Sequence, residues 1–234
     1  MLVKYGGGIV QMSGSLAGTV FARNRFGNYA RPRTKPVNPK STRQESIRAI
    51  LSYLAEYWHT ELDDTQRGLW NVYAAAVAMK NRLGETIHLT GYNHFIRSNT
   101  AQKTMGETEV DAAPTILSLP EKDPLLVCTE EDIIAQTFTF TCDTSGWVPN
   151  GDPKFGIMIA QGKPQLASRN FFATPWRYMD FIDATEGAAG TGTLAAAFPF
   201  ALGQRVWFRA RIITDSVRLS EPWNLDPRDV EADV

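Results

Sequence analysis

The chain has 234 residues but few of the side chains on which metal proteins and most enzymes depend. It contains two cysteines, Cys128 and Cys142, and three histidines. Two cysteines cannot form a disulfide framework, and they cannot by themselves complete a four-ligand zinc site. We therefore expect no metal and no cofactor. We expect both thiols to stay free, with Cys142 packed as a small apolar group in a sheet core.

Long apolar runs are absent as well. Because no stretch of about 18 apolar residues occurs, the sequence predicts no membrane-spanning helix. The first ten residues, MLVKYGGGIV, lack the apolar stretch and the cleavage site of a signal peptide, so we expect no secretion by that route. Hydrophobic residues nevertheless make up 43% of the chain, which is enough to fill a core and excludes uniform disorder.

Sequence signatures of enzymes are missing too. The glycine run at residues 6–8 is not followed by the Gly-Lys-Ser/Thr of a phosphate-binding loop, and no HExxH spacing occurs. His59 fits the C-terminal end of a helix, where a cation is favoured, and His94 fits an aromatic core. We therefore expect no catalytic activity and no small-molecule substrate.

Charge is unevenly distributed, although the net charge is only −1. Residues 1–44 contain eight basic side chains and no acidic one, whereas residues 107–132 contain eight acidic side chains and one lysine. Such an asymmetry is typical of a chain whose basic end contacts a negative surface, either nucleic acid or the acidic region of another copy. The basic residues are Lys4, Arg23, Arg25, Arg31, Arg33, Lys35, Lys40 and Arg43.

Residues 1–41 are predicted to form an extended basic docking arm that contains a β-hairpin. Segments 19–22 and 28–31 have strand character and flank a turn region at 24–27. Three prolines between residues 32 and 39 then impose an extended path. The alternative is a flexible leader, which would not need aromatic side chains. The residues expected to bind a partner are Phe21, Arg23, Arg25, Phe26, Tyr29, Arg31, Arg33 and Lys35.

Residues 42–106 are predicted to form a small three-helix bundle. Thr42 with Glu45 fits a capping box, in which two side chains satisfy free amides at the start of the first helix. The same pattern recurs before the second helix as Asp63 with Gln66.

Apolar residues recur at helical spacing through this region. The second helix is expected to end near residues 81–84, and Thr90 is expected to cap a third helix that stops by Gly106. The first two apolar stripes are Ile47, Ile50, Leu51, Leu54 and Trp58, then Leu69, Trp70, Tyr73, Ala74 and Val77.

Residues 107–226 are predicted to form an antiparallel β-sandwich of the fibronectin type III or immunoglobulin kind, before an acidic tail at 227–234. Residues 136–142 alternate apolar and hydroxyl side chains, as a strand with one buried face does. Residues 203–214 alternate an apolar set, expected to be buried, with a basic and aromatic set, expected to be a binding face or a cation–π ladder. The first set is Val206, Phe208, Ala210 and Ile212, and the second is Arg205, Trp207, Arg209 and Arg211. The predicted fold class is thus α+β.

Short motifs follow one another in order through about residues 6–100. They include SGSLAGTVF at 13–21, GNY at 27–29 and LTGYNHFIRSN at 89–99, with Gln44, Arg48, Trp58, Arg67 and Trp70 between them. This series resembles a family of tailed-phage and prophage proteins of unassigned function. Residues 203–222 are similar to the last hairpin of a fibronectin type III module. The resemblance implies a virion component and supplies no catalytic residues.

The sequence therefore predicts a structural component of a tailed bacteriophage virion, at the neck, the tail or another accessory position. Its arm would dock onto other virion proteins or onto copies of the same chain in an oligomer. Two alternatives stay open: a capsid decoration protein, and a nucleic-acid-binding module that uses the basic arm. We expect the protein in the virion after assembly in the host cytoplasm, with weak nucleic-acid contact at most and no membrane contact.

Overall fold

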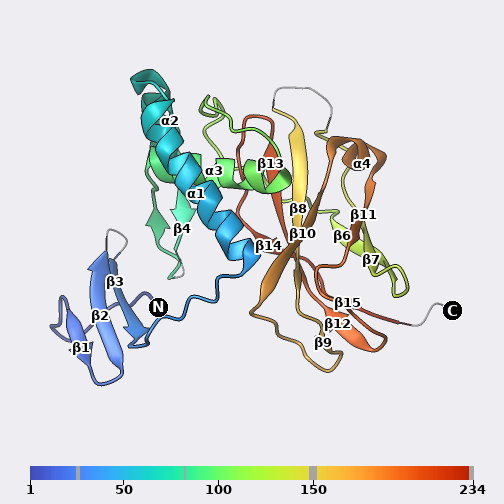
Figure 1. The fold of residues 1–234 in the computed structure, drawn as a ribbon, viewed down its shortest axis with the longest axis horizontal. Helices are drawn as coiled ribbons and strands as arrows, with labels where there is room; N and C mark the ends of the chain where they lie inside the picture. Colours follow the sequence, from blue (N-terminus) through green and yellow to red (C-terminus); the bar gives the residue numbers. More distant parts are fainter. Residues whose placement is uncertain (25–26, 82, 148–151, 232–234) are drawn as a thin grey trace.

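The computed structural model describes residues 1–24, 27–81, 83–147 and 152–231. Helices gather in the middle of the chain, while antiparallel strands form the N-terminal segment and most of the second half. The protein thus belongs to the α+β class, as predicted. Figure 1 shows that the N-terminal sheet lies apart from the strands of the second half, with the helices beside both.

The N-terminal segment forms an antiparallel sheet in the order β1-β2-β3. Its strands are β1 Gly14–Leu16, β2 Thr19–Asn24 and β3 Gly27–Pro32. Asn24 pairs with Gly27 at the closed end, so the predicted hairpin is confirmed. Leu2 forms a bridge with Tyr29 along the other side of β3. Strand β1 pairs with β2 and with no other described strand, which leaves one edge of the sheet open.

Three longer helices follow the N-terminal sheet. They are α1 Thr42–Thr60, α2 Asp64–Ala76 and α3 Gly91–Met105. The capping box of Asp63 and Gln66 is confirmed, since both of its reciprocal hydrogen bonds are present. Thr90 caps α3 through its side-chain oxygen, and Gly106 ends that helix in the left-handed conformation, as expected.

Two expectations for the helix surfaces are wrong. The capping box of Thr42 and Glu45 does not form, because the helix already begins at Thr42 and Ser41 occupies the N-cap position without a side-chain cap. Leu51 and Leu69 are 40% and 53% exposed instead of buried. Each helix buries only a narrow stripe against its neighbours, and the other apolar residues of the predicted sets already occupy that stripe.

The end of α2 also differs from the prediction. The helix stops at Ala76 rather than near residues 81–84. Val77 is buried as expected, but its backbone is already extended, with φ −83° and ψ 107°. The chain continues as a small hairpin of β4 Met79–Lys80 and β5 Thr86–Ile87.

The helices share an aromatic core. Trp70, Tyr73 and Phe95 are almost completely buried, and the rings of Trp70 and Phe95 meet edge to face with centroids 5.6 Å apart. Gly91 lets α3 begin directly against α2, because a Cβ at this position would lie 2.6 Å from Asn71 Oδ1 and 2.7 Å from backbone atoms of α2. Packing this close fixes α2 and α3 relative to each other.

The second half of the chain folds into antiparallel sheets that pack like a β-sandwich. The sheet orders are β10-β8-β13-β14, β11-β7-β6 and β15-β12-β9, and the short helix α4 Ala184–Ala189 follows β10. The first two sheets face each other through aromatic rings, since the centroid of Phe208 lies 4.9 Å from that of Phe138 and 5.0 Å from that of Phe140. The strands are β6 Val127–Asp132, β7 Thr137–Thr141, β8 Lys154–Gly162, β9 Gln165–Leu166, β10 Trp176–Ile182, β11 Thr191–Ala195, β12 Gln204–Val206, β13 Phe208–Thr214, β14 Trp223–Asn224 and β15 Arg228–Asp229.

Both cysteines are free and Cys142 is buried, as predicted, and Cys128 is buried as well. Cys128 on β6 and Cys142 after β7 belong to the same apolar core. Burial raises the pKa of Cys128 to about 12 and that of Cys142 to about 11, because a thiolate is poorly solvated there. Neither thiol is therefore an active nucleophile at neutral pH.

The alternation predicted for residues 203–214 is only partly right. The apolar set is buried as expected. The opposite set is not one exposed face, because the strand is interrupted at Trp207, which is 7% exposed and stacks on Phe172 with centroids 5.2 Å apart. Arg209 instead lies over the ring of Trp176, 4.3 Å from its centroid. Separate ring contacts thus replace the expected ladder.

The turn after β13 joins the sandwich to the helices. Val217, at its tip, is fully buried in the helical core rather than among the strands. Asp152 holds the turn from the sandwich side, accepting hydrogen bonds from Ser216 N at 2.9 Å and from Arg218 Nε at 2.6 Å. The turn therefore belongs to both parts of the molecule.

Arg97 on α3 holds the same turn from the helical side. Its guanidinium donates to the carbonyl oxygens of Leu219 and Ser220 at 2.5 and 2.6 Å. Burial, together with the nearby charge of Arg211, lowers the pKa of Arg97 to about 10, yet the group stays protonated at neutral pH.

We expect R97A to reduce the free energy of unfolding by about 3 kcal/mol, because it leaves two buried carbonyl groups without a donor. Urea denaturation measures this change. The control is R48A, an exposed arginine of α1 that bonds to Asn38, for which we expect a change below about 0.5 kcal/mol. Equal effects of the two substitutions would show that the Arg97 contacts do not hold the turn.

His94 gives a second prediction. It is completely buried, packs edge to face on Tyr73, and has no hydrogen-bond partner among the described residues for either ring nitrogen. Burial lowers its pKa to about 4. The unfolded chain binds a proton at this residue near pH 6.5 and the folded chain does not, so stability is complete above that pH and is lost as the pH falls toward 4.

The measurement compares unfolding free energies of the wild type and H94F from pH 7 to pH 4. We expect the wild type to lose about 3 kcal/mol more than the variant over this range, since each pKa unit corresponds to about 1.4 kcal/mol. Parallel pH profiles would contradict the assignment of a neutral, buried His94.

Candidate docking surface

The N-terminal sheet has no core of its own. Among the described residues, none before Leu54 is buried, so both faces of β1, β2 and β3 are at least partly open to solvent. Leu16 is 67% exposed, and Phe21 and Tyr29 are only partly buried. A sheet of this size is stable when an apolar face packs against another element, so contact with a second surface would stabilise it.

The strand register divides the predicted partner-binding residues between the two faces of the sheet. Phe21 and Arg23 lie on one face, because side chains alternate along β2. Phe21 pairs with Ala30, and directly paired residues share a face. Tyr29 and Arg31, the neighbours of Ala30, therefore lie on the opposite face. Each face combines one aromatic and one basic side chain.

The other predicted residues lie outside the sheet. Arg33 and Lys35 are exposed in the extended segment that leads to α1. Arg25 and Phe26 lie outside the residues that the structure describes. The predicted set is therefore a basic, two-sided element and not a single patch.

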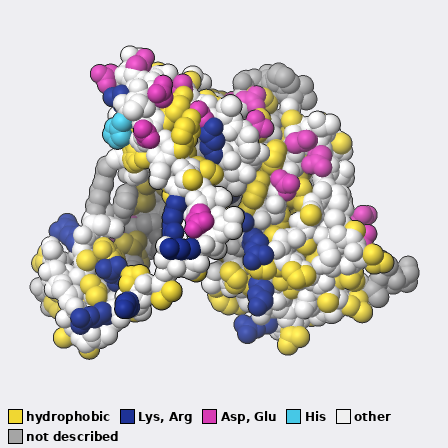
Figure 2. Space-filling view, viewed as in Figure 1, with side chains coloured by type: hydrophobic (Ala, Val, Ile, Leu, Met, Phe, Trp, Pro, Cys, Tyr) yellow, Lys and Arg dark blue, Asp and Glu magenta, His cyan; other side chains and the backbone are white. Residues whose placement is uncertain are grey.

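The arginines of the sheet are not neutralised within the described part of the chain. Arg23 donates to the neutral Gln11 Oε1 at 3.3 Å, and Arg31 is exposed. Figure 2 shows dark blue and yellow side chains spread over this sheet, with no magenta side chain among them in that view. The surface suits a partner that offers carboxylates beside apolar contacts.

Few contacts attach the sheet to the rest of the molecule. Lys4 Nζ forms an ion pair with Glu85 Oε1 at 2.5 Å, which links the N-terminal segment to the hairpin of β4 and β5. A cleft of about 460 Å³ lies between them, lined in part by Tyr5 and Leu83. Both charged side chains are well exposed, so solvent screens the pair and it stabilises the sheet little. The sheet is thus held in place by weak contacts.

The pairing of the first residues of the chain with β3 was not predicted. Val3 N donates to Asn28 O at 2.9 Å, so the first residues lie along β3 as an additional extended segment. The short apolar and polar run Leu2–Tyr5 is a signal that could have indicated this pairing.

The acidic stretch at 107–132 is partly used inside the chain. Half-buried and buried carboxylates in it have intramolecular partners, so another copy would offer fewer free acids than the sequence suggests. The ion pairs join Glu109 to Lys103, Asp123 to Lys154, and Glu131 to Arg228. Exposed acids with no ion pair to a described residue are Glu107, Glu121, Glu130 and Asp132.

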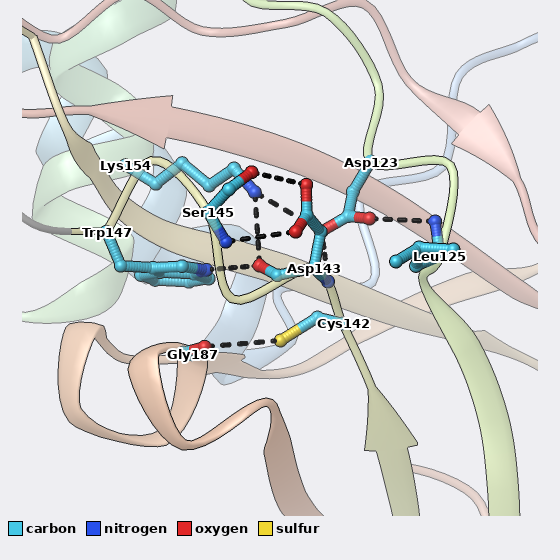
Figure 3. A network of polar contacts seen from close by, with 8 residues as sticks. All are labelled: Asp123, Leu125, Cys142, Asp143, Ser145, Trp147, Lys154 and Gly187. Carbon is cyan, nitrogen blue, oxygen red and sulfur yellow. Dashed lines mark hydrogen bonds and ion pairs between the residues drawn. The ribbon is translucent and has the colours of Figure 1, made fainter.

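Carboxylates also gather at one end of the sandwich (Figure 3). Asp123 is buried, accepts hydrogen bonds from Leu125 N at 2.9 Å and Asp143 N at 3.0 Å, and pairs with Lys154 Nζ at 3.4 Å. The Asp143 carboxylate accepts hydrogen bonds from the amide and hydroxyl groups of Ser145. Each carboxylate has partners in the cluster, which therefore ties loops together and is not an open reactive site.

Residues 1–24, 27–81, 83–147 and 152–231 contain no candidate metal site and no candidate membrane-spanning helix. In these ranges no group of three or more His, Cys, Asp or Glu side chains is placed to hold a metal ion. No helix within them has both the length and the apolar content needed to cross a bilayer.

Comparison with known proteins does not identify a function for the chain. No family model matches the chain, and no curated protein matches it. A solved structure similar to part of it is the twitchin kinase region from C. elegans (Fn31-NL-kin-CRD-Ig26), with 12% sequence identity and a TM-score of 0.32. The match covers 48% of this chain and 17% of the twitchin chain. At this level of similarity, the match assigns no function to the chain.

Proposed function

We propose that the protein is a structural docking component of a tailed bacteriophage particle, with the N-terminal sheet as its docking element and no catalytic role. The observation that carries the proposal is that this sheet lacks any buried residue among those described, although it is regularly hydrogen-bonded. A sheet formed without a core is completed by a partner. The resemblance of residues 6–100 to phage proteins supports the choice of particle.

The docking surface favours a protein partner over a nucleic acid. Apolar side chains lie beside the arginines on both faces, and the open edge of β1 can pair with a strand of the partner. The segment at 33–41 is fully exposed and contains Pro36 and Pro39, so it loses little entropy when the sheet docks. A partner groove with carboxylates along its rim would match this surface, whether at the neck, at the tail or on the capsid.

In this proposal the rest of the chain projects from the docking site toward the outside of the particle. Residues 42–106 act as a compact three-helix bundle that sets the distance from the docking site. The strands after residue 123 act as a fibronectin type III-like sandwich that faces outward. The joint at residues 214–220 supports this arrangement, because it fixes the sandwich to the helices independently of the N-terminal sheet.

We expect deletion of residues 1–41 to leave the remaining fold intact and to abolish incorporation into particles. The apolar clusters of the helices and the sandwich contain no residue from this segment. The thermal midpoint should therefore shift by less than about 3 °C, equivalent to about 1 kcal/mol for a chain of this size. Circular dichroism measures the midpoint, and mass spectrometry of purified particles measures incorporation.

A charge-matched pair of variants separates docking from general electrostatics. R31Q/R33Q removes one charge from the N-terminal sheet and one from the residue that directly follows it, whereas R169Q/K163Q removes two from exposed positions on the sandwich. We expect only the first pair to lower the copy number in particles. Normal copy number for the deletion variant would show that the docking role is wrong.

A salt titration of DNA binding tests the nucleic-acid alternative. Each phosphate neutralised adds about 0.9 to the slope of log affinity against log salt. We expect weak binding to duplex DNA, with a slope magnitude below about 3, that disappears near physiological salt. Tight binding with a steep slope at physiological salt would instead identify the basic arm as a nucleic-acid-binding module.

A further inference from the structure

A cleft between the helices and the sandwich is lined by arginines. Its volume is about 250 Å³, and its walls are the start of α1, the second half of α3 and strands β8, β10 and β13. None of its described lining residues is acidic. Figure 2 shows dark blue side chains in a row over the strands beside the start of α1. The basic lining residues are Arg43, Arg97, Arg209 and Arg211.

The strand register explains why Arg209 and Arg211 of β13 line this cleft. Arg209 pairs with Ala160 of β8, and Arg211 pairs with Met158. These positions alternate with residues that face the sandwich core, such as Ala210, so both arginines extend from the opposite face of the sheet, toward the helices. The basic set predicted at 203–214 is thus divided, with its last two members in the cleft.

Arg211 lacks a counter-ion in the cleft. Arg97 and Arg209 use their guanidinium groups in hydrogen bonds to oxygen atoms of the chain. Arg211 is partly buried and forms no hydrogen bond or ion pair with any described residue. Thr100, which lines the cleft from α3, also has a hydroxyl group with no hydrogen-bond partner in the described part of the chain. The hydroxyl group of Tyr178, which lines the cleft from β10, likewise has no partner among the described residues, so Arg211 and two hydroxyl groups beside one cleft are unused donors.

The local electrostatics favour an anion at this position. Burial lowers the pKa of Arg211, and the neighbouring charge of Arg209 lowers it further. Glu221 opposes these effects, but it is exposed and forms no ion pair with a described residue. A partly desolvated guanidinium without a counter-ion is unfavourable, and an oxyanion bound to it removes that penalty.

We propose that this cleft binds one oxyanion group, a carboxylate or a phosphate, carried by a small apolar body. The flat guanidinium of Arg211 can donate two parallel hydrogen bonds to such a group. Ile47, Met158 and Leu219 line the rest of the cleft, which suits a short aliphatic part of the ligand. The cleft is smaller than the 300–1,000 Å³ that is typical of pockets for larger ligands. The site is separate from the N-terminal sheet, so it does not depend on the docking role.

Isothermal titration of the full chain tests the proposal, with hexanoate, inorganic phosphate and hexylamine as probes at constant ionic strength. We expect saturable binding of at least one anion and no binding of hexylamine. The relative affinity of hexanoate and phosphate identifies the preferred head group. We expect R211Q to weaken anion binding at least about tenfold, because a charge-assisted pair is lost. The exposed R169Q, which makes the same charge change outside the cleft, should keep the wild-type affinity.

Thermal unfolding of the ligand-free variants gives an independent measurement. We expect R211Q to raise the midpoint, since it removes a desolvated charge without a partner, and R169Q to leave it unchanged. If R211Q does not fold, T100V provides the binding test, with a several-fold loss of affinity expected. The proposal is overturned if neither anion binds saturably, or if R211Q and R169Q weaken binding equally.

Discussion

Arg97 and Asp152 hold the turn at residues 214–220 from opposite sides, and the relation between the helices and the sandwich depends on this clamp. Burial alone would raise the pKa of Asp152, but hydrogen bonds from Ser216 and Arg218 lower it, so the carboxylate stays charged. Val217, at a positive φ of 56°, is thereby inserted into the helical core. The arginine-lined cleft lies beside this joint, because Arg97 belongs to both.

The motif at residues 89–99 illustrates how a local sequence specifies this architecture. Thr90 caps α3, Gly91 permits close contact with α2, and Phe95 fills the aromatic core. Arg97 reaches the turn of the sandwich, and Asn99 accepts a hydrogen bond from Val110 N at 2.7 Å, which directs the chain after the helix. The motif therefore supports the fold.

Local features of the fold could be predicted from the sequence, whereas long-range ones could not. The cap at Asp63 and the alternation along β7 follow from nearest neighbours, and both are present in the structure. The bonds of Arg97 to Ser220 span 123 residues, so no local period indicates them. The exposure of Leu69 and the burial of Trp207 depend on which elements pack together. The arginine-lined cleft also forms between elements that are distant in the sequence, so local patterns did not indicate it. For the N-terminal sheet, the sequence indicated the hairpin but not the division of its aromatic and basic residues between two faces.

The N-terminal sheet differs from the sheets of the sandwich in one physical respect, since none of its described residues is buried. Amide hydrogen exchange of the isolated protein and of assembled particles tests this difference directly. The account predicts that amides of β2 and β3 exchange rapidly in the isolated protein, compared with those of α3 and β13, and become protected in the particle. Equal protection of all four elements in the isolated protein, with no change on assembly, would contradict it.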